Sequence, residues 1–324
     1  MPEFKIKHLT QYTYQSPVRD SANQIILFPV NDAYQEVQTQ DLKISGNPSI
    51  YMSKDYYGND VGNFSYSSPH SELIILSTTV VSTRNKPLPS DNLPIEQQWE
   101  KLKSLRSNIN FIDFLNQDMF EGIKELQDVV FASQPFTLSP YNNALNYCDY
   151  VFQNFNYIPG ITTVETTSAV ILQLKAGVCQ DFAHILLVML RLAKIPARYV
   201  SGYICPHKNG MRGEGATHAW VEAYIPDYGW LGLDPTNNCI ANETHVRLAV
   251  GRNFTDCSPV KGVYKGLPQH LMEVSVTVSY EDDDTISEDS PTVVIEKAQS
   301  NLGDNSYRRH EDLMQQQQEQ QQQQ

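Results

Sequence analysis

Up to about residue 86, apolar and polar positions alternate in short runs with the period of β-strands. These runs are FKIKHLTQYTY, NQIILFPV, VQTQDLKISG, GNFSYSS and ELIILSTTVVST, and turn-forming pairs such as Asn47-Pro48 separate them. Short strands punctuated in this way are typical of a β-sandwich. The proline-rich segment NKPLPSDNLPIEQ then indicates a linker. We therefore expect a sandwich-like, β-rich N-terminal domain over residues 1–86.

From residue 95 onward, the apolar residues recur with the period of helices. EQQWEKLKSLRS, FEGIKELQDVVFAS and NNALNYCDYVFQNF each follow this pattern. Thr166 or Thr167 could cap a helix over SAVILQLKA, which Gly177 would end. A further helix is expected from Cys179 to about Lys194, just before the next proline. Because that helix is apolar on nearly all sides, it should lie at the centre of the core.

Strands return after this central helix, in ARYVSGYIC, THAWVEAYI, WLGLD, HVRLAV and MEVSVTVSY. Helices followed by strands favour an α+β core over a doubly wound sheet, and we place this core at residues 95–280. The acidic segment YEDDDTISED and the glutamine-rich end follow. We expect residues 281–324 to be largely disordered, with TVVIEKA as the one strand-like run.

The charge of the chain limits the classes of partner that it can bind. A formal net charge of −13 argues against nucleic acid, which needs a basic face. No run approaches the roughly eighteen apolar residues of a membrane span, and the first residues show no signal-peptide pattern. We therefore expect a cytoplasmic protein that binds neither nucleic acid nor membranes.

Five cysteines are present, at widely spaced positions and without a C-x-x-C pair, which favours free thiols over disulfides. A zinc site built from Cys205, His207, Cys239 and His245 is an alternative, but its spacing matches no common ligand pattern. The sequence therefore predicts no metal.

Cys179 falls in the first turn of the predicted central helix, in the segment AGVCQDFAHI. Unpaired N–H groups and the positive end of the helix dipole stabilise a thiolate there. Such a thiolate can attack a carbonyl carbon if a base lies nearby. Position alone does not separate a nucleophile from a small buried residue, because buried free cysteine is common.

The segment THAWVEAYIPDYGWLGLDPTNN supplies the other groups that a thiol enzyme needs. On a strand, His218 shares a face with Trp220, and Asp234 lies on the next strand. An imidazole can pair with the thiolate, and a carboxylate or an amide can orient the ring. A three-residue turn would pair residue 218 with residue 238, so Asn238 is an alternative orienting group.

GVCQDFAHILLVMLRLAKIPARYVSGY followed by THAWVEAYIPDYGWLGLDPTNN resembles the core of the transglutaminase-like superfamily of cysteine enzymes. HVRLAVGRNFTDCSPVKGVYKG, YTYQSPV and DYYGNDVGNFSYSSPHSELII extend the resemblance to the bacterial branch, over roughly residues 1–280. It implies a papain-like α+β core in which Cys179 is the nucleophile, His218 the base and Asp234 the residue that orients the histidine. On this basis Asp234 is preferred to Asn238.

The sequence gives weaker evidence for the roles of other residues near this pattern. The backbone N–H of Cys179 is the natural first oxyanion donor, and Gln173 is a candidate for the second. Trp220 and Trp230 either wall the acyl site or belong to the core. Asp181 and His184 are interpreted as scaffold residues.

The resemblance implies acyl transfer from an amide or peptide carbonyl of a protein or peptide substrate, through a thioester. Hydrolysis, as by a cysteine protease, is the first expectation, and transamidation or deamidation of protein glutamine is the second. A non-catalytic binding module is the third reading. No cofactor is expected, and the acidic run lacks the glycine and spacing of a calcium loop. The glutamine tail is interpreted as a disordered segment rather than an acyl donor.

Overall fold

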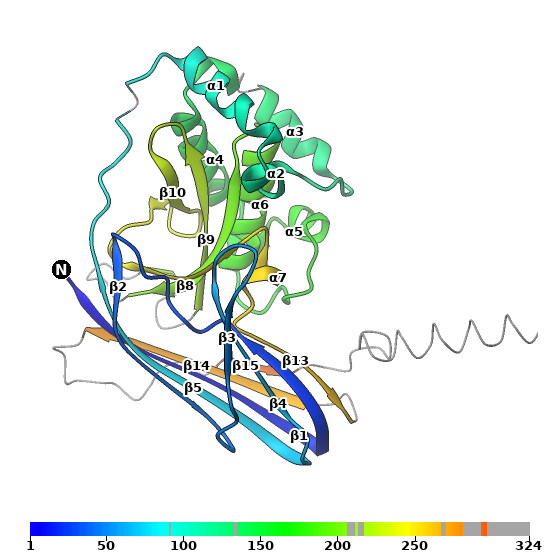
Figure 1. The fold of residues 1–324 in the computed structure, drawn as a ribbon. Helices are drawn as coiled ribbons and strands as arrows, with labels where there is room; N and C mark the ends of the chain where they lie inside the picture. Colours follow the sequence, from blue (N-terminus) through cyan, green and yellow to red (C-terminus); the bar gives the residue numbers. More distant parts are fainter. Residues whose placement is uncertain are drawn as a thin grey trace, which may run out of the picture.

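Two antiparallel sheets form the framework of the fold. The computed structural model describes residues 1–90, 92–132, 135–205, 211–212, 217–266, 270–280 and 293–296. The N-terminal sheet lies against a core in which helices cover a second sheet (Figure 1). This arrangement confirms the expected α+β class, with an N-terminal antiparallel sheet and a transglutaminase-like core.

The N-terminal sheet is built around one long strand, β1, which has neighbours on both edges along its length. The first half of β1 pairs with β14 and β5, and its second half pairs with β13 and β4. Register shifts after Thr13 and after Arg19 bend the strand between these halves. The strands are β1 (Glu3–Ile25), β2 (Gln35–Ile44), β3 (Tyr51–Lys54), β4 (Asp60–Tyr66), β5 (His70–Thr83), β13 (Val260–Lys265), β14 (His270–Tyr280) and β15 (Val293–Glu296).

The core sheet has the order β11-β10-β9-β8-β12. Its strands are β8 (Ala197–Ile204), β9 (Thr217–Ile225), β10 (Gly229–Asp234), β11 (Cys239–Ile240) and β12 (His245–Gly251). The short strands β6 (Asn156–Tyr157) and β7 (Ala176–Gly177) form a separate parallel pair.

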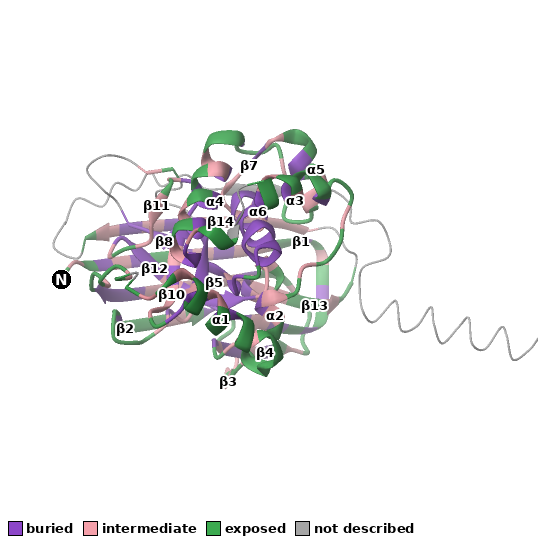
Figure 2. Ribbon diagram, turned by 90° about the horizontal axis from the view of Figure 1, so that it is seen from above, coloured by how far each residue is buried: buried purple, intermediate pink, exposed green. Residues whose placement is uncertain are grey.

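Helix α6 (Cys179–Leu192) is the centre of the core, as its apolar residues predict. It packs on β8 and β9, and α3, α4 and α5 surround it. Figure 2 shows α6 as a mostly buried helix among helices with exposed faces. The other helices are α1 (Ile95–Ser104), α2 (Ile109–Leu115), α3 (Ile123–Ala132), α4 (Pro140–Asn154), α5 (Ser168–Leu174) and α7 (Phe254–Cys257), with 3-10 turns at Leu105–Ser107 and Pro135–Thr137. No helix in the described ranges has the length and hydropathy needed to cross a membrane.

Several elements differ from the sequence-based expectation. Strands β13 and β14 lie within the range assigned to the core, yet they pair with β1 in the N-terminal sheet. The strand pattern indicates an extended segment but does not identify the sheet that it joins. A short strand also forms at 293–296, beside β14. The rest of the acidic and glutamine-rich tail lies outside the described residues.

The end of α5 also differs from expectation. The helix ends at Leu174, and Lys175 at φ 49° adopts the left-handed conformation expected of Gly177. Gly177 has a different role, because a β-carbon there would lie 2.4 Å from Oδ2 of Asp181. The glycine therefore allows Asp181 to fold back over the chain just before Cys179.

The N-terminal sheet and the core sheet pack against each other through one shared apolar cluster. Tyr203 of β8 and the adjoining Cys205, with Val246 and Leu248 of β12, are buried against the N-terminal sheet. Within this contact, Nδ1 of His8 on β1 lies 2.9 Å from the Tyr203 hydroxyl. The N-terminal sheet is thus packed on the core as one layer of the fold.

Two side-chain amides of the N-terminal region complete the open edge of β12. Asn59 donates to the carbonyl of Val250 at 2.7 Å and accepts from the Val250 N–H at 2.8 Å. Gln35 makes the same pair of bonds with Arg247, at 2.8 and 2.7 Å. Each amide replaces a neighbouring strand, so the edge of β12 has its backbone groups paired without a further strand.

We predict that Asn59→Ala destabilises the protein by about 2–4 kcal/mol, because it leaves the buried N–H and C=O groups of Val250 without partners. Urea denaturation of the full chain measures this loss. Asn156→Ala, at an exposed asparagine of β6, is the control and should change stability by less than about 0.5 kcal/mol. Equal effects of the two substitutions would contradict the edge-completing role.

Two buried histidines predict a loss of stability in mild acid. Burial lowers the pKa of both His8 and His184 to about 4 from the ordinary 6.5. The unfolded chain therefore binds more protons between these pH values, and stability falls as the pH drops from 6.5 to 4. His8→Asn should reduce this slope by up to about 1.4 kcal/mol per pH unit. Tyr203→Phe removes the same hydrogen bond but keeps the titrating ring, so its slope should match the wild type in denaturation series across this range.

Candidate active site

The first turn of α6 presents Cys179 at its N-terminus. Val178 is extended before the helix, and its N–H donates to Oδ2 of Asp181 at 2.8 Å. The Thr162 hydroxyl donates to the same oxygen at 2.6 Å. Burial raises the pKa of Asp181, while these two bonds favour its charged form. Asp181 therefore fixes the entry of the helix, as its scaffold interpretation predicts, and Cys179 itself stays partly exposed.

The register of β9 and β10 brings His218 and Asp234 together. Glu222 pairs with Gly232 and Val221 with Leu233, which places Asp234 on the same face as His218 and diagonal to it. The turn has the three residues that the sequence analysis assumed, but it lies one residue earlier, at residues 226–228, and Asp227 takes a positive φ of 63° within it. Nε2 of His218 lies 2.9 Å from Oδ2 of Asp234, and both side chains are fully buried.

Five donors surround the Asp234 carboxylate. Besides His218, the backbone N–H groups of Thr236 and Asn237 donate to Oδ1 at 2.9 and 3.3 Å. The Asn237 amide and Nε2 of His245 donate to Oδ2 at 2.8 and 3.3 Å. The Asp-Pro-Thr-Asn sequence thus wraps its own carboxylate in a turn and holds it ionised in the interior.

The electrostatics of the pair favour a charged imidazole. Burial alone would lower the pKa of His218, but the charge and hydrogen bond of Asp234, with a further contribution from the side chain of Cys179, raise it to about 10. Burial opposes the ionisation of Asp234, yet His218 and His245 hold its pKa well below the usual range. His218 therefore carries a proton across neutral pH.

The second ring nitrogen of His218 is directed away from Asp234. Since Nε2 is engaged by the carboxylate, Nδ1 is the atom left to meet a reacting group. Nδ1 is buried and has no conventional hydrogen-bond partner among the described residues. The side chain of Cys179 acts electrostatically on this ring, since it is among the groups that raise the pKa of His218. One imidazole thus connects the thiol at the helix N-terminus with the buried carboxylate.

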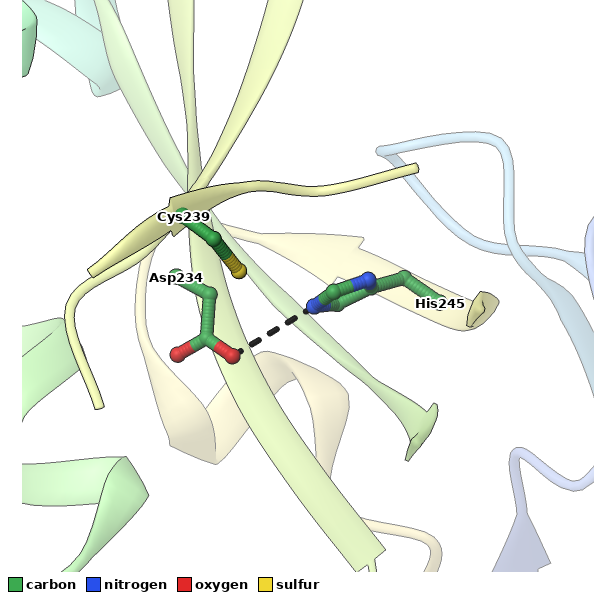
Figure 3. Close-up of side chains that lie close together, drawn as sticks. All are labelled: Asp234, Cys239 and His245. Atoms are coloured by element: carbon green, nitrogen blue, oxygen red, sulfur yellow. Dashed lines mark hydrogen bonds and ion pairs between the residues drawn. The ribbon is translucent and has the colours of Figure 1, made fainter. Parts of the chain in front are cut away.

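His245 is a site residue that the sequence analysis listed only as a zinc ligand. Its ring and the Cys239 thiol both lie beside Asp234 (Figure 3). Nδ1 of His245 faces the Asn242 N–H at 3.4 Å, so Nε2 carries the proton that Asp234 accepts. Burial lowers the pKa of His245, which keeps this donor neutral.

Cys239 and His245 do not form the zinc set considered from the sequence. Cys205 is buried in the apolar contact between the sheets, and His207 lies outside the described residues. Burial and the charge of Asp234 raise the pKa of Cys239 to about 12, and Nε2 of His245 donates to Asp234. Of the four residues considered for zinc, only Cys239 and His245 therefore lie together, and they do so beside Asp234.

The remaining sequence candidates lie elsewhere. Asn238 is exposed and donates to Asp149, so it does not orient His218. Gln173 is exposed on α5, and no contact in the described ranges joins it to Cys179. Trp220 is buried beside His218, and Trp230 packs against Phe111 and Phe114.

We predict that Asp234→Asn lowers the pKa of His218 from about 10 to 6.5 or below, because burial then acts without the opposing carboxylate. Nuclear magnetic resonance titration of ring-labelled histidines measures this value. His8, with a pKa of about 4 in the N-terminal sheet, is the internal reference and should not move. A His218 pKa that stays near 10 in the variant would show that Asp234 is not the source of the shift.

Comparisons with known proteins agree with this geometry. Residues 132–235 match the transglutaminase-like superfamily, and residues 4–82 match the bacterial transglutaminase-like N-terminal region. An uncharacterized protein of Mycobacterium leprae is 31% identical over 282 residues, which span 86% of this chain and 99% of that protein. A protein-glutamine gamma-glutamyltransferase of Pseudomonas aeruginosa is 30% identical over 135 residues, 36% of this chain and 20% of that protein.

One solved structure shares the fold over nearly its whole length. The crystal structure of a "putative cysteine protease" from Cytophaga hutchinsonii covers 91% of this chain and 98% of its own, with a TM-score of 0.64 at 20% identity. At that identity, the likeness concerns the fold alone. The two matched regions and the full-length mycobacterial relative together show that this chain belongs to the transglutaminase-like superfamily, in the branch with the bacterial N-terminal region.

Proposed function

We propose that the protein catalyses thiol-dependent acyl transfer from an amide or peptide carbonyl, with Cys179, His218 and Asp234 as its triad. One observation carries this proposal: the buried imidazole of His218 is held by Asp234 through Nε2, and the side chain of Cys179 also acts on the ring and helps to raise its pKa. A structural histidine would need only one of these contacts. The pair of contacts matches the base and orienting group that a thiol nucleophile requires.

In the proposed reaction, Sγ of Cys179 attacks the carbonyl carbon and forms a tetrahedral intermediate. The first backbone N–H groups of α6 have no carbonyl one turn earlier, so that of Cys179 can donate to the oxyanion. When the C–N bond breaks, His218 gives its proton to the departing nitrogen, and a thioester remains. Water or an amine then attacks the thioester, His218 takes the proton back, and Cys179 is released.

We propose hydrolysis of a peptide or amide bond as the first outcome, on the protease-like fold. Transamidation or deamidation of protein glutamine is the second candidate, because a protein-glutamine gamma-glutamyltransferase of Pseudomonas is 30% identical to this chain over 135 residues. Both outcomes share the thioester, and they differ in the nitrogen that leaves and in the group that attacks.

We predict that Cys179→Ala abolishes turnover of peptide substrates, which mass spectrometry of a peptide library measures directly. A new N-terminus indicates proteolysis, and a mass gain of an added primary amine indicates transamidation. Conversion of a glutamine to glutamate, with ammonia released and with neither cleavage nor amine incorporation, indicates deamidation. Cys257→Ala is the control, since that thiol is buried in α7, and it should keep activity.

Alkylation by iodoacetamide at about pH 6 tests the ion pair without a known substrate. The imidazolium of His218 should stabilise a thiolate at Cys179, which then reacts roughly tenfold or more faster than a free thiol. Cys239 is also partly exposed, but its pKa of about 12 should keep it unreactive in the same sample. Slow alkylation of Cys179, together with no Cys179-dependent turnover, would favour a binding module and refute the enzyme proposal.

A further inference from the structure

A cavity of about 240 Å³ lies between the N-terminal sheet and the core sheet. It opens on the face of β9 that carries Trp220 and Glu222, opposite the face that packs on α6. The residues that matter for its chemistry are two acids, four cations and four aromatic rings, namely Asp32, Glu222, Arg84, Lys86, Arg198, Arg247, Tyr34, Trp220, Tyr228 and Trp230. The proposed triad is outside this lining, so the cavity is a separate site.

The charges in the cavity do not cancel. Nε of Arg198 lies 2.7 Å from Glu222, and Arg247 pairs with both Glu222 and Asp32. These contacts match two acids with two arginines, and Arg84 pairs with Glu36, which lies outside the lining. Lys86 is then the excess cation, in a chain whose overall charge is strongly negative.

Lys86 is held by groups that do not neutralise it. Its Nζ donates to the carbonyl of Trp230 at 2.8 Å and lies 4.0 Å from the centre of the Tyr228 ring. Burial lowers the pKa of Lys86, and the attraction of Glu222 only partly opposes this effect. An anion in the cavity would stabilise the charged form of this lysine.

The indole N–H of Trp220 is a second, independent reason to expect a ligand in the cavity. The side chain is 1% exposed, and its Nε1 has no hydrogen-bond partner among the described residues. This atom lies on the Gly232 side of the cavity lining, 3.5 Å from where a β-carbon at that glycine would stand. Because buried indole N–H groups normally find an acceptor, the orphaned donor indicates a missing acceptor in the cavity.

We propose that this cavity binds a monoanionic carboxylate with a flat apolar body. The single excess charge of Lys86 matches one negative charge, and a carboxylate oxygen can also accept from the Trp220 indole. Tyr34, Tyr228 and Trp230 supply aromatic walls for the body of the ligand. The volume lies just below the ~300–1,000 Å³ of drug-sized sites, which suits a small ligand or one terminal residue of a peptide.

This assignment does not depend on the acyl-transfer proposal, because none of its residues is in the proposed triad. His245 borders both regions: it lines the cavity and donates to Asp234. Binding is therefore tested directly and without any enzymatic readout.

The probes are benzoate, its neutral analogue benzamide, inorganic phosphate, and a tripeptide ending in phenylalanine with a free or an amidated C-terminus. Tryptophan fluorescence of the full-length protein reports binding, since two of its three tryptophans line the cavity. We expect saturable binding of benzoate or the free-acid peptide, at least about tenfold tighter than that of the neutral forms and of phosphate. Benzoate binding identifies a small carboxylate as sufficient, and binding of the peptide alone identifies a peptide terminus.

Two variants and a control locate the site. Lys86→Met should weaken carboxylate binding about tenfold or more, because it removes the excess charge. Trp220→Phe keeps an aromatic ring but removes the N–H donor, and it should also weaken binding. Lys124→Met, on α3 outside the cavity, is the charge-matched control and should bind like the wild type. If Trp220→Phe does not fold, Lys86→Met decides alone, since Lys86 lies outside the helices and strands. Absent binding, equal affinity for benzamide, or no effect of Lys86→Met would overturn the proposal.

Discussion

The buried carboxylate of Asp234 is the constraint on which the rest of the core depends. An unpaired ionised carboxylate in a protein interior would cost several kcal/mol, so the chain must supply enough donors to hold it. Its five donors come from β9, from the turn after β10 and from β12. These elements are separate in sequence, and each must be in register for the carboxylate to be satisfied. The same hydrogen bonds that stabilise Asp234 therefore fix the position of the His218 ring.

The hydrogen bonding of Asp234 also depends on the N-terminal sheet, because that sheet supports β12. His245 stands at the start of β12, and the far edge of that strand is completed by the amides of Gln35 and Asn59. The apolar contact around Tyr203 and Leu248 holds the two sheets together along the same strands. The N-terminal region thus supports one donor of the buried carboxylate through the strand that carries it. Its removal would expose the edge and the apolar face of the core sheet.

Residue patterns alone predicted the class of the fold and the components of the site. Alternation along THAWVEAYI and WLGLD placed His218 and Asp234 on one face, and the apolar run after Cys179 predicted the central helix, as the structure shows. The exact strand pairing was wrong by two residues, because the three-residue turn lies one residue earlier than assumed, at residues 226–228, and alternation along the strands does not fix which residues form the turn. The partners of β12 could not be predicted. Gln35 and Asn59 bind backbone atoms 212 and 191 residues away, and side-chain identity does not encode such contacts. The roles of Cys179, His218 and Asp234 in catalysis stay predictions.

The contrast among the five cysteines shows how position, rather than residue type, selects a nucleophile. Burial raises the pKa of Cys148, Cys205, Cys239 and Cys257, and for Cys148 and Cys239 the nearby charge of Asp234 raises it further. The same carboxylate raises the pKa of His218, so the ring that Cys179 acts on is held in its charged form. Cys179 faces that imidazolium from the N-terminus of α6, where the helix dipole also favours negative charge. We attribute the reactivity proposed for Cys179 to the position of His218 between the thiol and Asp234. The charged group nearest to the sulfur is then the positive imidazolium, and the negative carboxylate lies beyond it.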